Sequence, residues 1–64
     1  MAMQQWEYLI VDHRYGGQII SDGKPLESKD IYQYLKQLGE QGWEMVGLGT
    51  AAGGTRYAFK RPKP

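Results

Sequence analysis

The segment 5–11 (QWEYLIV) constrains the fold of this chain more than any other. It is rich in aromatic and β-branched residues, which is typical of a strand. Alternation along a strand places Trp6 and Tyr8 on one side and Leu9 and Val11 on the other. A strand that is apolar on both faces is covered on both faces, so we expect this segment in the middle of a sheet.

The other elements follow from local signals. Asp22-Gly23 is typical of a hairpin turn, Ser28 or Asp30 can cap a helix, and apolar residues recur at i, i+3, i+4 and i+7 from Ile31. We expect Gly39 to let the last helical turn approach the sheet closely. In chain order the predicted elements are strands at 5–11 and 18–21, a helix at 28–41 and strands at 43–48 and 56–61.

This order predicts an α+β fold for residues 1–64, a single small β-β-α-β-β domain. One helix packs on a mainly antiparallel four-stranded sheet, and residues 62–64 form a flexible tail. One helix covers only one face of such a sheet, yet both faces carry apolar side chains. The uncovered face therefore predicts an interaction surface. Trp6, Tyr8 and Trp43 are the residues that we expect in the core or at this interface.

With 64 residues and no cysteine, the chain has a small core and neither a disulfide nor a thiolate metal site to stabilise it. Folding buries about 6,400 Å², about 60% of it apolar, which supplies on the order of 95 kcal/mol. Ordering the chain costs about the same. Burial of further surface against a second copy would tip this balance, so we expect a homo-oligomer.

Charge and hydropathy exclude several classes of protein. The formal net charge is +1, but Arg56, Lys60, Arg61 and Lys63 follow residue 50 with no acidic residue among them. This cationic strip either meets phosphates or an acidic partner, or keeps an edge strand and tail soluble. No apolar run is long enough to span a bilayer, and the first residues do not resemble a signal peptide. We expect a cytoplasmic protein that does not contact membranes.

Three stretches also resemble a known family. They are W-E-Y-L-I-V at 6–11, L-K-Q-L-G-E-Q-G-W-E-M-V at 35–46 and Y-A-F-K-R-P at 57–62. Together they resemble a family of very short bacterial and phage proteins catalogued as a domain of unknown function. The resemblance implies the same α+β fold and implies no reaction. It does not cover residues 12–25, where features particular to this chain can lie.

Catalytic patterns are weak. His13 follows an aspartate and could act as a general base, but a lone surface histidine is usually solvated. Glu7 and Glu44 both follow tryptophans and could form a carboxylate pair, or they could face solvent or pair with Arg56 and Lys60 across the sheet. We expect no catalytic residue, no enzymatic activity, no cofactor and no metal.

The glycine-rich segment 47–56 is the best candidate for a ligand site. Glycines let backbone N–H groups converge on an anion, and threonine and arginine side chains add donors. A second pair of glycines follows an arginine and a tyrosine, which suit a nucleotide phosphate and base. The alternative is a hairpin loop that binds nothing. The candidate ligand-binding residues are Arg14, Tyr15, Gly49, Thr50, Gly53, Gly54, Thr55 and Arg56.

Tyr57 and Phe59 alternate with basic residues and could stack on single-stranded nucleic acid, but we expect them to face the helix as core. Nucleic acid is therefore not an expected partner. The sequence predicts a non-catalytic homo-oligomeric binding module that captures a small anionic, nucleotide-like ligand at a subunit boundary. Sequestration of a signalling nucleotide would fit that role. The alternative is an assembly module that docks a partner protein through the uncovered sheet face.

Overall fold

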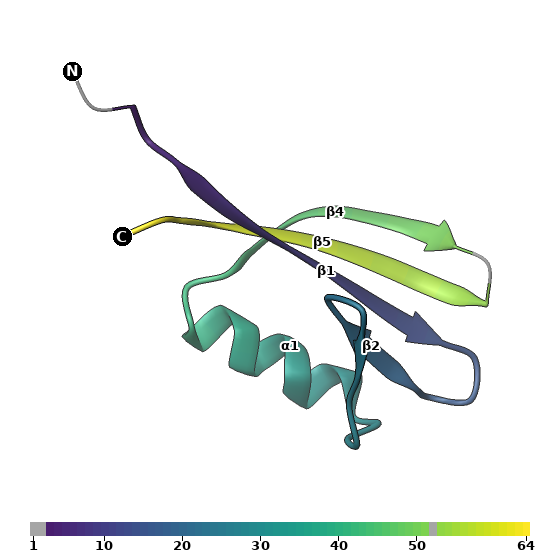
Figure 1. The fold of residues 1–64 in the computed structure, drawn as a ribbon. Coiled ribbons are helices and arrows are strands. Elements are labelled where there is room, and N and C mark those ends of the chain that lie inside the picture. The colour runs from purple at the N-terminus through teal and green to yellow at the C-terminus, as the bar shows by residue number, and fades with distance from the viewer. Residues whose placement is uncertain (1–2, 52) are drawn as a thin grey trace.

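The strand predicted from segment 5–11 forms the centre of an antiparallel sheet in a computed structural model, which describes residues 3–51 and 53–64 (Figure 1). The strand order is β3-β2-β1-β5-β4, and one helix lies against one face of the sheet. The fold is a small α+β fold, as the sequence predicts. The elements are β1 (Trp6–Arg14), β2 (Ile19–Ser21), β3 (Lys24–Pro25), α1 (Ile31–Glu40), β4 (Glu44–Ala51) and β5 (Gly54–Pro62).

The sheet has five strands, so the prediction of four strands is wrong. The additional strand, β3, is two residues long and pairs with β2 directly after the Asp22-Gly23 turn. Both turn residues have positive φ, 52° and 83°, which is the backbone shape that returns a strand on itself. Two residues are too few to show an alternating pattern, and one of them is a proline, so no local signal predicts a strand here.

The helix is shorter than predicted. Its N-cap is Asp30, whose carboxylate accepts a hydrogen bond from the Gln33 N–H at 3.1 Å. Ser28 lies outside the helix and accepts from the Asp30 N–H. The chain leaves the helix through Gly42, whose φ of 89° suits glycine. The prediction for Gly39 is wrong, because a Cβ built there would meet nothing within 4 Å.

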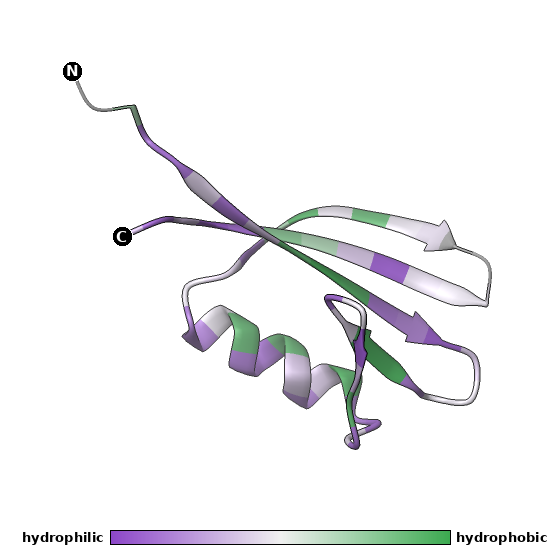
Figure 2. Ribbon diagram, in the orientation of Figure 1, coloured by the Kyte–Doolittle hydropathy of each residue, from purple (hydrophilic) through white to green (hydrophobic). Residues whose placement is uncertain are grey.

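The core lies between α1 and one face of the sheet (Figure 2). Ser21 Oγ and Tyr34 Oη are 2.6 Å apart and join β2 to the helix. Leu9 and Tyr57 pack against the core from β1 and β5, so Tyr57 and Phe59 face the helix as predicted. The buried residues are Val11, Ile19, Ile31, Leu38 and Phe59.

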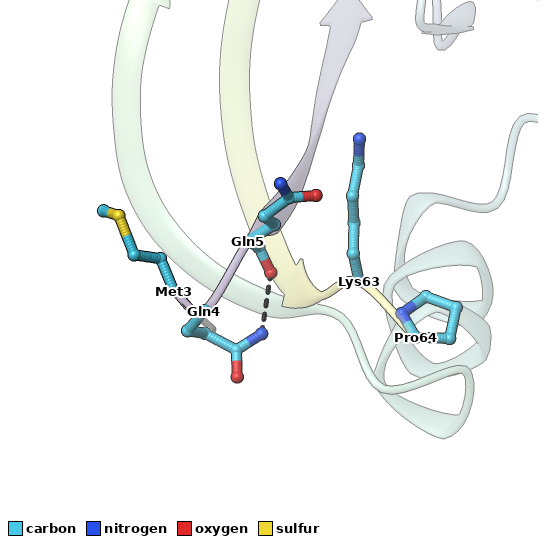
Figure 3. A pocket seen from close by; sticks show the side chains of 5 residues that line it. All are labelled: Met3, Gln4, Gln5, Lys63 and Pro64. Carbon is cyan, nitrogen blue, oxygen red and sulfur yellow. Dashed lines mark hydrogen bonds between the residues drawn. The ribbon is translucent and has the colours of Figure 1, made fainter. Parts of the chain in front are cut away.

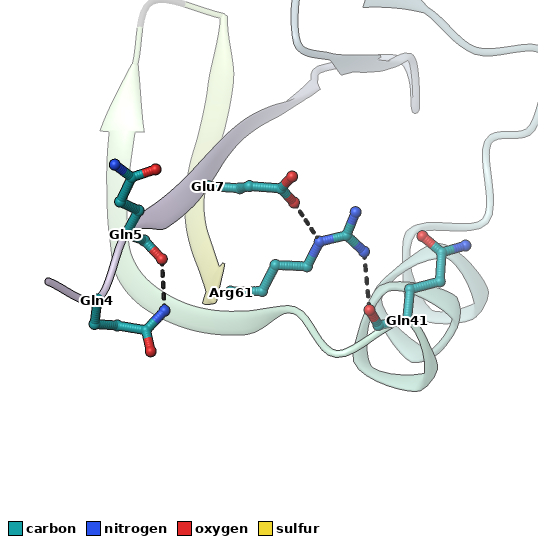
Figure 4. A network of polar contacts seen from close by, with 5 residues as sticks. All are labelled: Gln4, Gln5, Glu7, Gln41 and Arg61. Atoms are coloured by element: carbon teal, nitrogen blue, oxygen red, sulfur yellow. Dashed lines mark hydrogen bonds and ion pairs between the residues drawn. The ribbon is translucent and has the colours of Figure 1, made fainter. Parts of the chain in front are cut away.

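Arg61 connects the sheet to the end of the helix (Figure 4). Its Nε donates to Glu7 Oε2 at 2.6 Å, and a terminal nitrogen donates to the Gln41 carbonyl at 2.9 Å. The guanidinium also lies 4.3 Å from the centre of the Trp43 ring, which packs against the core.

Pro62 belongs to β5, and the Lys63 N–H donates to the Gln5 carbonyl. Within the described residues, no helix has the length and apolar character needed to cross a membrane.

Candidate functional site

The strand register sorts the side chains of the sheet onto two faces. Residues directly opposite one another on neighbouring strands point to the same side. Leu9 lies opposite Phe59 on the side that α1 covers. Tyr8 lies opposite Lys60 and therefore on the other side, which we call the open face. The side chains that define the open face are Trp6, Tyr8, Ile10, Asp12, Arg56, Ala58 and Lys60.

An apolar band runs along β1 on the open face. Tyr8 is 68% exposed, and its neighbours Trp6 and Ile10 are each more than a third exposed. Ala58 of β5 lies opposite Ile10, so nothing polar interrupts the band there. Trp6 and Tyr8 are therefore exposed side chains of this face. Contiguous exposed apolar surface of this kind marks an interaction site in small proteins.

Charges of both signs border the band. At one end, Lys60 Nζ lies 4.2 Å from the centre of the Trp6 ring, and Glu44 of β4 lies opposite Lys60 in the register. At the other end, Arg56 Nε donates to Asp12 Oδ1 at 2.7 Å. A face with both signs at both ends carries no large net field, so a second copy of the same face would not be repelled.

The Asp12–Arg56 pair has an electrostatic consequence. The hydrogen bond from the Arg56 guanidinium lowers the pKa of the Asp12 carboxyl below its ordinary value of 3.8, and the charge of Arg14 acts in the same direction. The same hydrogen bond raises the pKa of Arg56. Both groups are therefore charged at neutral pH, and each already has a partner.

The molecule is elongated, which leaves much surface exposed. Its radius of gyration is 12.7 Å, against about 10.7 Å for a compact chain of this length. It exposes 4903 Å², about 700 Å² more than compact proteins of this mass. One partner buries about 800 Å² in a standard stable interface. The surface in excess is therefore of the size that one such contact removes from water.

The turn between β1 and β2, which contains Gly16 and Gly17, and the turn between β4 and β5, which contains Gly53, lie at the same end of the sheet (Figure 1). We call them the glycine turns. The Tyr15 N–H donates to the Gly53 carbonyl at 2.7 Å, and Arg14 lies opposite Gly54 in the β1–β5 register. A Cβ on Gly54 would collide with the carbonyl oxygen of His13, so the two backbones approach closely. The structure thus brings together two groups of candidate ligand residues that are far apart in the sequence.

The connection between β4 and β5 is shorter than the one predicted between strands at 43–48 and 56–61. Since β4 ends at Ala51 and β5 begins at Gly54, three candidate ligand residues belong to strands: Gly49, Thr50 and Thr55. Ala52, within the predicted glycine-rich segment, lies outside the described residues, as do Met1 and Ala2. Strand pairing uses the backbone groups of Gly49 and Thr55, which a phosphate would otherwise take. An anion at this end would therefore meet the turn itself and the exposed side chains of Arg14 and Tyr15.

A hollow lies at the opposite end of the sheet (Figure 3). Its volume is about 340 Å³, and it is lined by Met3, Gln4, Gln5, Lys63 and Pro64. These residues lie near the two termini and include none of the candidate ligand residues. The hollow is thus separate from the glycine turns.

Glu7 and Glu44, which were considered as a carboxylate pair, do not lie together. Glu7 pairs with Arg61 on the covered face, and not with Arg56 or Lys60 as one interpretation predicted. Glu44 lies on the open face opposite Lys60, so the sheet separates the two carboxylates. Among residues 3–51 and 53–64, no three histidine or carboxylate groups gather as metal ligands.

Comparison with protein families, curated proteins and solved structures gives no match for this chain. The functional interpretation therefore depends on the geometry described above. The sequence predicted a strand at 43–48 but not its position at the edge of the sheet, where Leu48 of β4 is 67% exposed. The signal was present, since the stretch from Met45 to Ala51 contains no charge and no proline.

Proposed function

We propose that this chain is a non-catalytic binding module that acts as a homo-oligomer, with the open face as an interface between subunits. The observation that carries the proposal is the apolar band of Trp6, Tyr8 and Ile10, exposed on the side of the sheet away from α1. Burial of this band removes aromatic surface from water, which is the main favourable term in association. The proposal includes the cytoplasmic location expected from the sequence.

Sedimentation velocity over a dilution series tests this interface. Tyr8→Lys places a charge in the centre of the band and should raise the dissociation constant about thirtyfold, the effect of a central aromatic contact. Tyr32→Lys is the matched control, because Tyr32 is 78% exposed on α1 and lies off the sheet. Equal association of both variants would contradict the open face as the interface. If the wild-type protein is a monomer, the homo-oligomer is contradicted and the open face is instead expected to bind a different protein.

A second function is favoured by the meeting of the two glycine turns. We propose that their end of the sheet captures a small anionic ligand of nucleotide type, with Arg14 on the phosphate and Tyr15 on the base. The Tyr15–Gly53 hydrogen bond, which joins the turns, supports this placement. Arg56 would join the site only by leaving Asp12. Capture without turnover would amount to sequestration of the ligand.

Isothermal titration calorimetry with AMP, ADP and GDP tests the ligand site. Arg14→Ala should weaken binding at least tenfold, the loss of one charged hydrogen bond. Asp12→Asn releases Arg56 and should strengthen binding if Arg56 contributes. Lys24→Ala removes a cation from β3, at the opposite edge of the sheet from β4, and is the control. Absence of heat with every nucleotide would end the proposal of a nucleotide site.

A further inference from the structure

The two edges of the sheet differ in how they are protected. One edge is β3, which is two residues long and consists of Lys24 and Pro25. Short length, lysine and proline are the features by which proteins keep an edge from pairing. The other edge is β4, which has eight residues, no proline and no charge after Glu44. Of the two edges, only β4 is suited to accept another strand.

The hydrogen bonds at the two ends of the β1–β5 ladder show which residues of β4 point outward. The Tyr15 N–H donates to the Gly53 carbonyl, and the Lys63 N–H donates to the Gln5 carbonyl. In an antiparallel pair the bonded positions alternate. The odd-numbered residues of β5 therefore bond to β1, and its even-numbered residues bond to β4.

This alternation fixes the outer edge of β4. Gly47 and Gly49 lie opposite even-numbered residues of β5 and direct their N–H and C=O groups inward. Leu48 and Thr50 lie between them and direct theirs away from the sheet. Within the described part of the chain, β4 pairs only with β5. Leu48 and Thr50 thus offer two donors and two acceptors to a further strand.

The side chains along this edge leave room for that strand. Leu48 lies opposite Tyr57 on the covered side of the sheet, yet it is 67% exposed. Gly47 and Gly49 have no side chain on the open face, and a Cβ built on Gly49 would meet nothing within 4 Å. The bulge between Met45 and Gly47 bends only the start of the strand.

We propose that β4 pairs antiparallel with β4 of a second copy, about a two-fold axis at Leu48. In this register Leu48 faces its own copy and Gly47 faces Gly49. No like charges meet, since Glu44 lies outside the paired segment. A pair of Leu48 side chains, each exposed in the single chain, then becomes a cross-strand apolar contact. An uncharged strand that is complementary to itself favours a second copy over a different protein.

The symmetry of this contact makes it distinct from the open-face interface. A two-fold axis that relates antiparallel neighbours in one sheet is perpendicular to that sheet. The two helices then lie on one side of a continuous sheet, and the two open faces lie together on the other side. The edge contact therefore does not use the open face, and each contact can form or fail without the other.

Charge pairing at Leu48 tests the edge contact. Leu48→Lys and Leu48→Glu should each weaken the association that depends on β4 about tenfold, because like charges then face one another. Mixing the two variants should restore association as a one-to-one complex in native mass spectrometry. Misfolding could not give that rescue. Tyr32→Lys is the control and should leave the wild-type assembly unchanged. Failure of the mixture to form the one-to-one complex would overturn the proposal.

Amide hydrogen exchange, followed residue by residue by NMR, gives a second test that needs no substitution. The Leu48 and Thr50 amides should be protected in the concentrated wild-type protein and should lose protection on dilution. The Gly49 amide bonds to β5 and should stay protected at both concentrations. Fast exchange of the Leu48 amide at high concentration would contradict the edge pairing. Tyr8→Lys should leave Leu48 protected, so failure of the open-face interface is read separately.

Discussion

Replacement of Arg61 by alanine tests how the sheet is fastened to the end of the helix. Arg61 contacts Glu7, the Gln41 carbonyl and the Trp43 ring at 2.6, 2.9 and 4.3 Å. The ion pair is about a third exposed on both sides and contributes roughly 0.5 kcal/mol after solvent screening. The bond to the carbonyl contributes about 1 kcal/mol and the cation–π contact about 0.5–1 kcal/mol. Arg61→Ala should therefore lower the free energy of unfolding by about 2–2.5 kcal/mol.

This loss is large for so small a domain. A chain of this length has a total stability of roughly 3–10 kcal/mol, so the variant loses a fifth or more of it. At about 4–8 °C per kcal/mol, the midpoint of thermal unfolding should fall by about 8–20 °C. Urea and thermal unfolding followed by circular dichroism, at one protein concentration for all variants, measure both quantities.

Arg56→Ala is the matched control for Arg61→Ala. Both arginines lie on β5 and pair with a carboxylate of β1, but Arg56 lies on the open face. Among the described residues, the hydrogen bonds of the Arg56 guanidinium go to the Asp12 carboxylate alone. The Arg56 variant should therefore lose clearly less stability. Equal losses in the two variants, or an unchanged midpoint for Arg61→Ala, would refute the assignment of Arg61 as the link to the helix end.

Three further predictions concern single contacts. Tyr34→Phe should cost about 1 kcal/mol in urea unfolding, because it leaves the half-buried Ser21 hydroxyl without its partner at 2.6 Å; an unchanged midpoint would contradict this. Gly54→Ala should destabilise by more than about 2 kcal/mol because its Cβ meets the backbone of β1, whereas Gly39→Ala should stabilise by up to about 1 kcal/mol because its site is open. The same sign in both glycine variants would refute the comparison. The lowered pKa of Asp12 means that its charged form stabilises the fold above pH 3.8, and that this stabilisation is lost as pH falls through the folded-state pKa. Acid titration of stability should therefore be shallower for Asp12→Asn below that pH, and parallel curves would contradict it.

The central strand and the two-sided apolar pattern could be predicted from sequence because alternation is a local property. Trp6 and Tyr8 were expected in the core or at an interface, and the structure exposes both on the open face. Which face the helix covers could not be predicted, since both sides of the strand are apolar. That choice depends on the crossing of α1 between the two edges of the sheet, and Leu9 and Val11 lie on the side that it covers.

Ion pairs that depend on strand register could not be predicted from local sequence patterns. Asp12 and Arg56 are separated by 44 positions and meet only because the β1–β5 ladder is aligned in one register. The same alignment pairs Glu7 with Arg61, where the sequence suggested other partners. The strands predicted at 43–48 and 56–61 are neighbours in the sheet, but both extend further than predicted because glycine and threonine continue the ladder.

Native mass spectrometry of the wild-type protein over a dilution series tests the central claim most directly, because it reports subunit number and retained ligand together. Self-association through the open face and the β4 edge predicts a homo-oligomer with an even number of subunits, which dissociates on dilution. A single monomeric mass at every concentration would contradict the claim.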